Sequence, residues 1–222
     1  MHFEILVEDS SGKIALEILV PQIIGAEHTF QVHAYQGIGR IPKGLKTTAD
    51  PQKRILLDQL PRLVRGYGKT FAAYPPNTAA LIVVCDLDRQ CLSAFRKELL
   101  ALVATCEPRP DTYFCIAVEE GEAWYLGDIA AIKRAYPHAK DAVLQSYTND
   151  SICGTWEKLA DAIVSGGLKT LQKQGWQAEG KEKAAWAATI PPHMDVDNNL
   201  SPSFCYFRDK LRRLLDEELH FI

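Results

Sequence analysis

The sequence has no apolar run long enough to cross a membrane, and this absence excludes a membrane-spanning segment. Its first residues, Met1–Glu4, do not form a basic region followed by the apolar core of a secretion signal. The six cysteines include no CxxC pair, so there is little support for a zinc site or a disulfide framework. We therefore expect a cytoplasmic protein with reduced thiols that does not enter a membrane.

Several catalytic motifs are also missing. Residues 10–13 read Ser-Ser-Gly-Lys, but a phosphate-binding loop needs an earlier glycine, and Ile14 stands where such a loop has Ser or Thr. Residues 86–88 read Asp-Leu-Asp, as in haloacid-dehalogenase phosphotransferases, but Gln90 replaces the Thr or Val of that motif. The histidines lack metal-type spacing, and no Ser/His/Asp or Cys/His constellation can be identified. These absences exclude a P-loop NTPase and disfavour a phosphotransferase or a nucleophile-based hydrolase.

The net charge is small, but it is unevenly distributed. The 222 residues carry a formal charge of −3, with 47% hydrophobic and 24% charged residues, as in ordinary soluble proteins. Between residues 37 and 69, eight basic residues stand against two acidic ones, so this segment is +6 and the remainder is −9. A basic lobe suits a phosphate-rich substrate, although a solvated helix face beside a basic loop has the same composition. The basic residues are Arg40, Lys43, Lys46, Lys53, Arg54, Arg62, Arg65 and Lys69.

Hydrophobic patterning predicts an α/β fold whose sheet is Rossmann-like, mainly parallel, of about four strands and flanked by helices. Strands are expected at residues 2–8, 28–35, 80–85 and 112–118, with helices between them. Asp50 and Pro51 have the chemistry of a helix start, and Pro61 should kink or divide that helix.

From Glu119 onward the pattern is helical, and no further strand is evident. Helices are expected near residues 121–136, 155–165, 181–190 and 203–219. We therefore divide the chain into an α/β core, residues 1–128, and a helical C-terminal extension, residues 129–222, that packs on the core.

Acidic residues follow three of the expected strands. Glu8 ends the first strand, and Asp86 and Asp88 end the third. The cluster after the fourth strand consists of Glu119, Glu120 and Glu122. Because the carboxyl ends of parallel strands share one edge, these carboxylates should converge there and repel one another unless a divalent cation is bound. The alternative is that they cap helices or complement helix dipoles.

This pattern of strand-end acids resembles the TOPRIM domain of topoisomerases, bacterial primases and OLD-type nucleases. In more detail, residues 118–128 (Val-Glu-Glu-Gly-Glu-Ala-Trp-Tyr-Leu-Gly-Asp) and 198–204 (Asn-Asn-Leu-Ser-Pro-Ser-Phe) are similar to stretches of an uncharacterised bacterial family in the same superfamily. Members of that family are often encoded beside ATPases, in loci that resemble phage-defence systems. The resemblance covers residues 1–128 for the TOPRIM core and the whole chain for the family.

The resemblance implies a Mg²⁺-dependent (or Mn²⁺-dependent) nuclease that cleaves phosphodiester bonds in DNA or RNA. It assigns Glu8 the role of general acid/base or metal ligand, and it assigns Asp86 and Asp88 the binding of Mg²⁺. Glu122 is the expected additional catalytic acid, with Glu119 and Glu120 as competitors. Glu120 is also expected as a metal ligand.

One position departs from the TOPRIM pattern. That domain has Gly directly after its first Glu, where close backbone approach is needed, and here the residue is Asp9. Asp9 either adds a ligand or marks a chemistry that has changed or been lost. The alternative function is therefore a non-catalytic regulatory or interaction subunit that docks on a partner ATPase through the helical C-terminal half. A homo-oligomer is a further candidate assembly.

A glycine-rich loop, residues 37–44, follows the second strand and should open on the same edge as the acids. Its Arg40 and Lys43 are expected to bind phosphate oxygens of the nucleic acid. Lys13, in the first turn of the first helix, could contact a phosphate as well. The structural alternatives are a simple glycine-rich turn and a solvated lysine.

Overall fold

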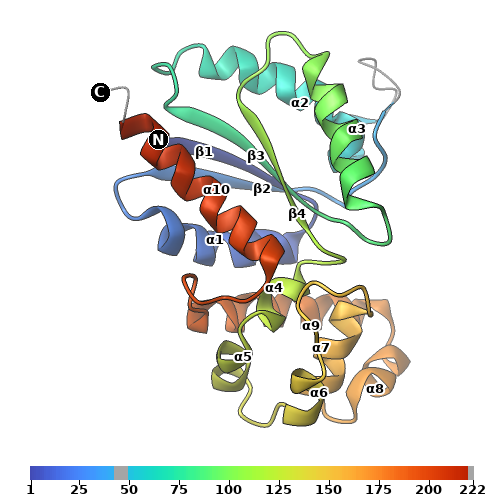
Figure 1. Ribbon diagram of the computed structural model, residues 1–222. Helices are drawn as coiled ribbons and strands as arrows, with labels where there is room; N and C mark the ends of the chain where they lie inside the picture. The colour runs from blue at the N-terminus through green and yellow to red at the C-terminus, as the bar shows by residue number, and fades with distance from the viewer. Residues whose placement is uncertain (43–49, 220–222) are drawn as a thin grey trace.

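A four-stranded parallel sheet forms the centre of the computed structural model, which describes residues 1–42 and 50–219 (Figure 1). The strands are β1 (His2–Val7), β2 (Thr29–Ala34), β3 (Ala79–Asp86) and β4 (Thr112–Ala117). All neighbouring pairs are parallel, in the order β2-β1-β3-β4. The predicted α/β class is confirmed, and the carboxyl ends of all four strands lie at one edge of the sheet.

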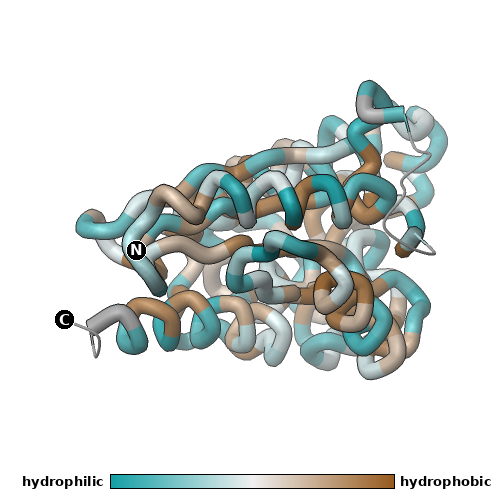
Figure 2. Tube along the Cα trace, turned by 90° about the horizontal axis from the view of Figure 1, so that it is seen from above, coloured by the Kyte–Doolittle hydropathy of each residue, from teal (hydrophilic) through white to brown (hydrophobic). Residues whose placement is uncertain are grey.

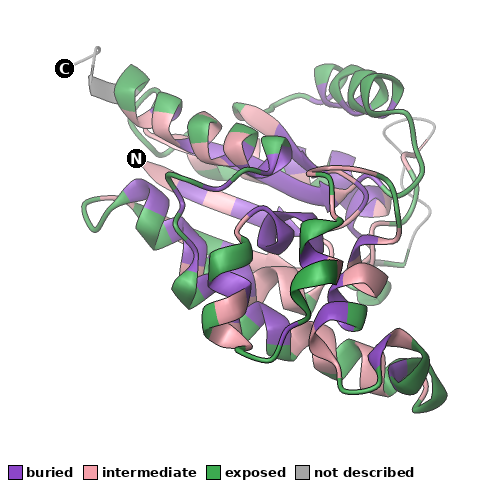
Figure 3. Ribbon diagram, turned by 60° about the horizontal axis from the view of Figure 1, so that its bottom comes forward, coloured by how far each residue is buried: buried purple, intermediate pink, exposed green. Residues whose placement is uncertain are grey.

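The strands β1, β3 and β4 are mostly apolar on both faces because helices cover both sides of the sheet (Figure 3). Successive side chains point to opposite faces, so Ile5 and Val7 join one hydrophobic core while Leu6 joins the other. In β3, Ile82 and Val83 divide in the same way. Burial on both sides explains why these strands read as continuous hydrophobic runs in the sequence.

Two helices lie on each face of the sheet. α2 (Leu56–Phe71) and α3 (Leu92–Ala104) cover one face, and α1 (Ser10–Ile24) and α10 (Pro202–Leu219) cover the other (Figure 1). Hydrophobic and hydrophilic stretches alternate along the helix nearest the C-terminus (Figure 2). In α10 this spacing buries Phe204, Phe207, Leu211 and Leu214, at intervals of three and four residues.

The predicted helix start at Asp50 is wrong. The Asp50 Oδ1 accepts a hydrogen bond from the Gln52 N–H (3.0 Å), but this caps only a 3₁₀ turn, Pro51–Lys53. Arg54 then takes a left-handed conformation (φ 49°), which interrupts the helical path, so α2 begins at Leu56. Pro61 lies inside α2 without dividing it, because the buried apolar stripe of this helix holds both halves on the sheet.

The chain beyond β4 contains only helical elements among its described residues. They are α4 (Glu122–Leu126), α5 (Ile129–Ala135), α6 (Asp141–Gln145), α7 (Thr155–Ile163), α8 (Gly167–Lys173), α9 (Trp176–Thr189), the 3₁₀ turn η2 (Pro191–His193) and α10. The helix expected at residues 121–136 is two helices, because the Asp128 carboxylate caps a new start by accepting from the Ala131 N–H (2.9 Å). The short helices α6 and α8 were not predicted.

The C-terminal helices are packed on the sheet and on one another. α9 lies against α1, and α10 runs along α1 and β4 (Figure 1). Side chains from α9 and α10 belong to the same hydrophobic core as one face of the sheet. Among the helices in the described residues, none has the length and apolarity that a membrane crossing requires.

Candidate functional site

The parallel sheet brings the three acidic segments to the same edge. The Glu8 Oε2 accepts a hydrogen bond from the backbone N–H of Asp86 (3.3 Å), which joins the ends of β1 and β3. The Asp88 N–H donates to the Glu119 carbonyl oxygen (2.9 Å), which joins the ends of β3 and β4. Segments that are far apart in the sequence are therefore neighbours here.

A small cavity of about 50 Å³ lies at this edge, between the ends of the strands and α1, α4 and α9. Glu8 and Asp86 line it from the sheet, and Glu122 lines it from the first turn of α4. The volume is sufficient for a few water-sized groups. The lining also includes polar side chains from the start of α1 and from α9, namely Asp9, Ser11 and Lys183.

Lys183 supplies a positive charge to this cavity, and no sequence pattern predicted it. Its Nζ lies 3.4 Å from the Glu122 Oε1 and 3.9 Å from the Glu120 Oε2. The same ammonium lies 5.4 Å from the centre of the Trp156 ring, in a cation–π contact. No local motif marks this lysine, because its placement depends on the packing of α9 against α1.

Carboxylates outnumber cations in and around the cavity. Burial raises the pKa of Glu8 to about 7, against a smaller opposing effect of the Asp86 N–H. Burial, followed by repulsion from Glu8 and Glu122, raises the pKa of Asp86 well above its ordinary value. Burial also raises the pKa of Glu120 to about 7, although Lys183 partly offsets this. These carboxyl groups therefore hold their protons more tightly than exposed carboxyl groups do.

Glu8 and Asp86 are the residues of the cavity that could hold a divalent cation. Within residues 1–42 and 50–219, no group of three or more His, Cys, Asp or Glu side chains is arranged to hold a metal. A structural zinc site needs such a closed set, whereas Mg²⁺ commonly takes one or two carboxylates and completes its shell with water and substrate oxygens. Glu8 and Asp86 match this smaller requirement.

Asp88 lies outside the cavity, contrary to the expected presentation of two carboxylates by the Asp-Leu-Asp segment. β3 ends at Asp86, and Asp88 has a left-handed backbone (φ 52°). The alternating direction of side chains along the strand therefore does not continue to Asp88. The Asp88 side chain is exposed, and it lines a neighbouring hollow together with Glu120 and Glu157.

The expected phosphate-binding residues are spread along the edge. The Lys13 Nζ pairs with the Glu17 Oε1 (3.3 Å) on an exposed part of α1, not with the cavity. Arg40 is exposed and lines a hollow with Gln90, at the same end of the sheet. Lys43 lies outside the described residues.

The family model described as Domain of unknown function (DUF4276) matches residues 7–212, which include the acidic segments at the strand ends and most of the C-terminal helical region. The chain belongs to this family. Searches of curated proteins and of solved structures gave no significant match.

Two acids of this DUF4276 chain have structural partners instead of facing the cavity with free oxygens. The Glu119 carboxylate accepts hydrogen bonds from the N–H groups of Cys153 (3.1 Å), Gly154 (2.9 Å) and Thr155 (2.9 Å), and also from the Thr155 hydroxyl. Burial alone would raise the pKa of Glu119, but these hydrogen bonds outweigh it and lower the pKa. Glu119 thus anchors the start of α7.

Asp9, the residue that departs from the TOPRIM pattern, caps α1. Its Oδ1 accepts from the Gly12 N–H (2.7 Å), and its Oδ2 accepts from the Ser11 hydroxyl. An added side chain at Gly12 would collide with Val7, so this tight start of α1 also holds the end of β1 in place. Local helix capping accounts for the presence of Asp9.

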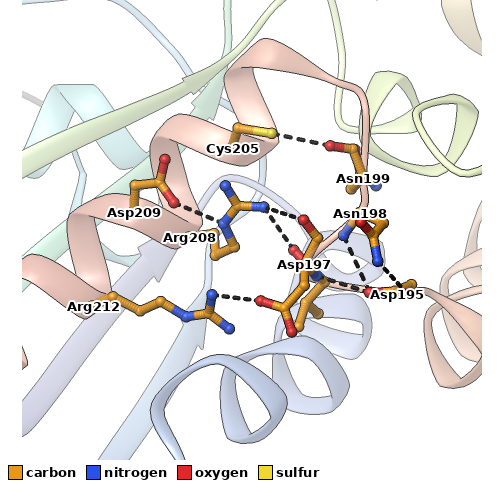
Figure 4. Close-up of polar contacts among 9 residues, drawn as sticks. Asp195, Asp197, Asn198, Asn199, Cys205, Arg208, Asp209 and Arg212 are labelled. Carbon is orange, nitrogen blue, oxygen red and sulfur yellow. Dashed lines mark hydrogen bonds and ion pairs between the residues drawn. The ribbon is translucent and has the colours of Figure 1, made fainter.

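The two stretches that resembled the bacterial family pack against each other. The Asn199 Nδ2 donates to the Trp124 carbonyl oxygen (2.8 Å), and the Trp124 Nε1 donates to the Ser203 Oγ (3.1 Å). Arg208 and Arg212 of α10 fix the preceding loop by bonding the Asp197 carbonyl oxygen and carboxylate (Figure 4). Residues 198–204 therefore support α4, which carries Glu122, and do not enter the cavity.

Proposed function

We propose that this DUF4276 chain is a Mg²⁺-dependent (or Mn²⁺-dependent) nuclease of TOPRIM type that hydrolyses phosphodiester bonds in nucleic acid. The observation that carries the proposal is the surplus of carboxylates around one cavity: Glu8, Asp9, Asp86 and Glu122 line it, together with the ammonium of Lys183. Strand-end acids on an all-parallel sheet support the resemblance to TOPRIM proteins.

In this proposal Glu8 and Asp86 hold the ion, and Lys183 keeps Glu120 and Glu122 in place behind them. The ion, when bound, would stabilise the negative charge that develops on a phosphodiester during hydrolysis. The pKa of about 7 belongs to Glu8 in the metal-free chain, where the carboxyl group can take up a proton near neutral pH, and a bound divalent ion would displace that proton.

The substrate would approach along the exposed edge of the sheet. Arg40 lies at that edge with an exposed side chain and is suited to binding a phosphate oxygen. Lys43, from the same segment of the chain, is proposed as a second phosphate contact, and Asp88 as a further ligand or acid beside the cavity.

The test combines metal binding with nuclease activity. Mn²⁺ binding is measured by electron paramagnetic resonance, and cleavage of single-stranded and double-stranded DNA and RNA is measured with Mg²⁺ or Mn²⁺. Glu8→Gln and Asp86→Asn are each expected to weaken Mn²⁺ binding at least tenfold and to lower cleavage by about 10² or more, since each removes a charged ligand. Glu27→Gln is the matched control, because this exposed acid precedes β2 at the opposite edge.

Equal Mn²⁺ affinity in wild type, Glu8→Gln and Asp86→Asn would reject the metal site. Intact metal binding with no cleavage of any nucleic acid would reject the nuclease and keep the cation site. The two readouts therefore separate the two parts of the proposal.

A second candidate function is a non-catalytic subunit of an ATPase complex, as the resemblance to genes found beside ATPases in phage-defence-like loci suggests. One observation favours it: Lys183 already neutralises part of the acidic cluster from within the chain. The exposed Trp176 (78% exposed), at the start of α9, offers a contact for such a partner. Co-purification with an ATPase encoded nearby, lost in Trp176→Ala, would support this function. An isolated monomer that cleaves efficiently would contradict it.

A further inference from the structure

A groove of about 610 Å³ runs beside β4 and shares no lining residue with the acidic cavity. The first turns of α3 and α10 form its walls, and β4 forms its floor. Its size is that of a typical ligand site. The apolar lining residues are Leu92, Phe114, Ile116, Val118, Pro202 and Tyr206.

The floor of the groove is the outer side of β4, which is not paired with another strand among the described residues, because β4 is the last strand in the order β2-β1-β3-β4. The Leu87 N–H donates to the Ala117 carbonyl oxygen (2.9 Å). The backbone N–H and C=O groups of Ala117 and of the other odd-numbered residues of β4 therefore face β3. Peptide groups alternate in direction along a strand, so those of Phe114 and Ile116 face outward. Among the described residues, no acceptor is bonded to these two outward N–H groups.

The polar groups of the groove differ in how many hydrogen bonds they already make within the chain. The N–H of Val118 donates to the Ser203 Oγ (3.4 Å), which closes one end of the free edge. The Asp150 carboxylate accepts from the Ser203 N–H (2.6 Å) and from a serine hydroxyl, so both of its oxygens are used. Arg96, by contrast, makes a long bond to the Tyr206 hydroxyl (3.4 Å) and lies over that ring. Within the part of the chain that the structure describes, no carboxylate is paired with its guanidinium, which can therefore pair with an acidic group of a ligand.

We infer that this groove binds an extended peptide segment of a partner protein, which adds as a fifth strand beside β4 and presents an acidic side chain to Arg96. A peptide backbone satisfies outward N–H and C=O groups as no other common ligand does. The apolar walls accept alternate side chains of such a strand. A single arginine matches one carboxylate, whereas a nucleic acid requires a row of cations. This inference does not depend on the proposed nuclease activity.

The experiment begins with a random library of displayed peptides of about ten residues, the usual upper length of a strand. Peptides selected on the wild-type chain are expected to contain β-branched residues at alternate positions and an Asp or Glu. Fluorescence anisotropy with a labelled selected peptide should show about tenfold weaker binding or worse for Arg96→Glu, because the charge pair becomes a repulsion. Lys97→Glu is the matched control, since Lys97 is exposed on the same helix and does not line the groove.

A second readout follows the strand pairing itself and needs no change to the protein. In amide exchange measured by NMR, the peptide should protect the N–H groups of Phe114 and Ile116, while Tyr113 and Cys115 are protected already by β3. Replacing one central residue of the peptide by proline should abolish this protection, because proline removes a backbone donor.

The inference is overturned if no peptide is enriched, or if Arg96→Glu and the proline peptide bind as well as their parents. Binding of a single-stranded oligothymidylate in the groove, lost in Tyr206→Ala, would replace it with a nucleic-acid site. Protection of Phe114 and Ile116 without any peptide, together with a dimer in sedimentation, would replace it with pairing between two copies of the chain.

Discussion

At the scale of single residues, the acidic cavity makes a specific prediction about pH. Burial raises the pKa of Glu8 from 4.5 to about 7 in the folded chain. Between these two values the folded state holds a proton that the unfolded state has released, so the free energy of unfolding should fall as the pH rises. The loss of stability caused by ionising the buried Glu8 carboxyl group should be complete above about pH 7 and absent below about pH 4.5. Glu120 is raised to a similar value and adds to the same trend.

The measurement is urea unfolding of the metal-free protein, in the presence of a chelator, at pH values from 5 to 8. Glu8→Gln should flatten part of the decline, because the neutral amide has no proton to lose. Glu27→Gln, which changes an exposed acid at the other edge, should leave the slope unchanged. A wild-type stability that is constant or rises across this window would contradict the prediction.

The residues of the site were predictable to different degrees for a physical reason. Glu8 and Asp86 follow apolar strands directly, so their positions at the sheet edge could be deduced from chain order. Asp88 and Glu119 also follow strands, but left-handed turns redirect both of them (φ 52° and 61°). Lys183 could not be predicted, because it reaches the cavity through tertiary packing that leaves no local pattern.

At the scale of elements, Glu119 is expected to be the anchor of α7. Its carboxylate is the shared acceptor for three backbone N–H groups, those of residues 153–155. Glu119→Ala should therefore leave the buried Thr155 N–H and two partly exposed N–H groups without this acceptor, and lower the free energy of unfolding by about 2–3 kcal/mol. Faster amide exchange should appear first in residues 153–163, ahead of the strands.

The control for this prediction is Glu157→Ala, which removes a partly exposed acid from the first turn of the same helix. That variant should lose well under 1 kcal/mol, and its amide exchange in α7 should resemble that of wild type. Equal losses in Glu119→Ala and Glu157→Ala would show that the carboxylate of Glu119 has no special role in holding α7.

The elements themselves show which signals in a sequence are strong. The strands β1, β3 and β4 were predicted because they are mostly apolar on both faces, and β2 was predicted from the alternation of Phe30, Val32 and Ala34 with other residues. The start of α2 was misplaced because Asp50 and Pro51 satisfy the rules for a helix start and for a 3₁₀ turn equally well. The helices α6 and α8 contain five and seven residues, too few for a helical period to be recognised.

At the scale of the whole molecule, the acidic cavity depends on both parts of the chain. Glu8, Asp86 and Glu122 come from residues 1–128, but Lys183 comes from α9. The face of the sheet beneath α1 also shares its hydrophobic core with Trp186 of α9. The predicted boundary at residue 128 therefore divides both a site and a core, although the division of the chain into two parts remains a prediction.

This arrangement predicts that residues 1–128 do not fold cooperatively when expressed alone. Phe204, Phe207 and Leu211 of α10 are fully buried against the sheet and α4, as is Trp186 of α9. Their removal forfeits about 1.5–3 kcal/mol for each side chain, which together approaches the whole stability of about 5–15 kcal/mol that a domain has. Circular dichroism during urea unfolding should show a broad, non-cooperative change for the fragment and a single sharp transition for the full chain. A fragment with its own sharp transition would establish residues 1–128 as an independent domain, and the C-terminal helices would then be an addition to a self-sufficient sheet.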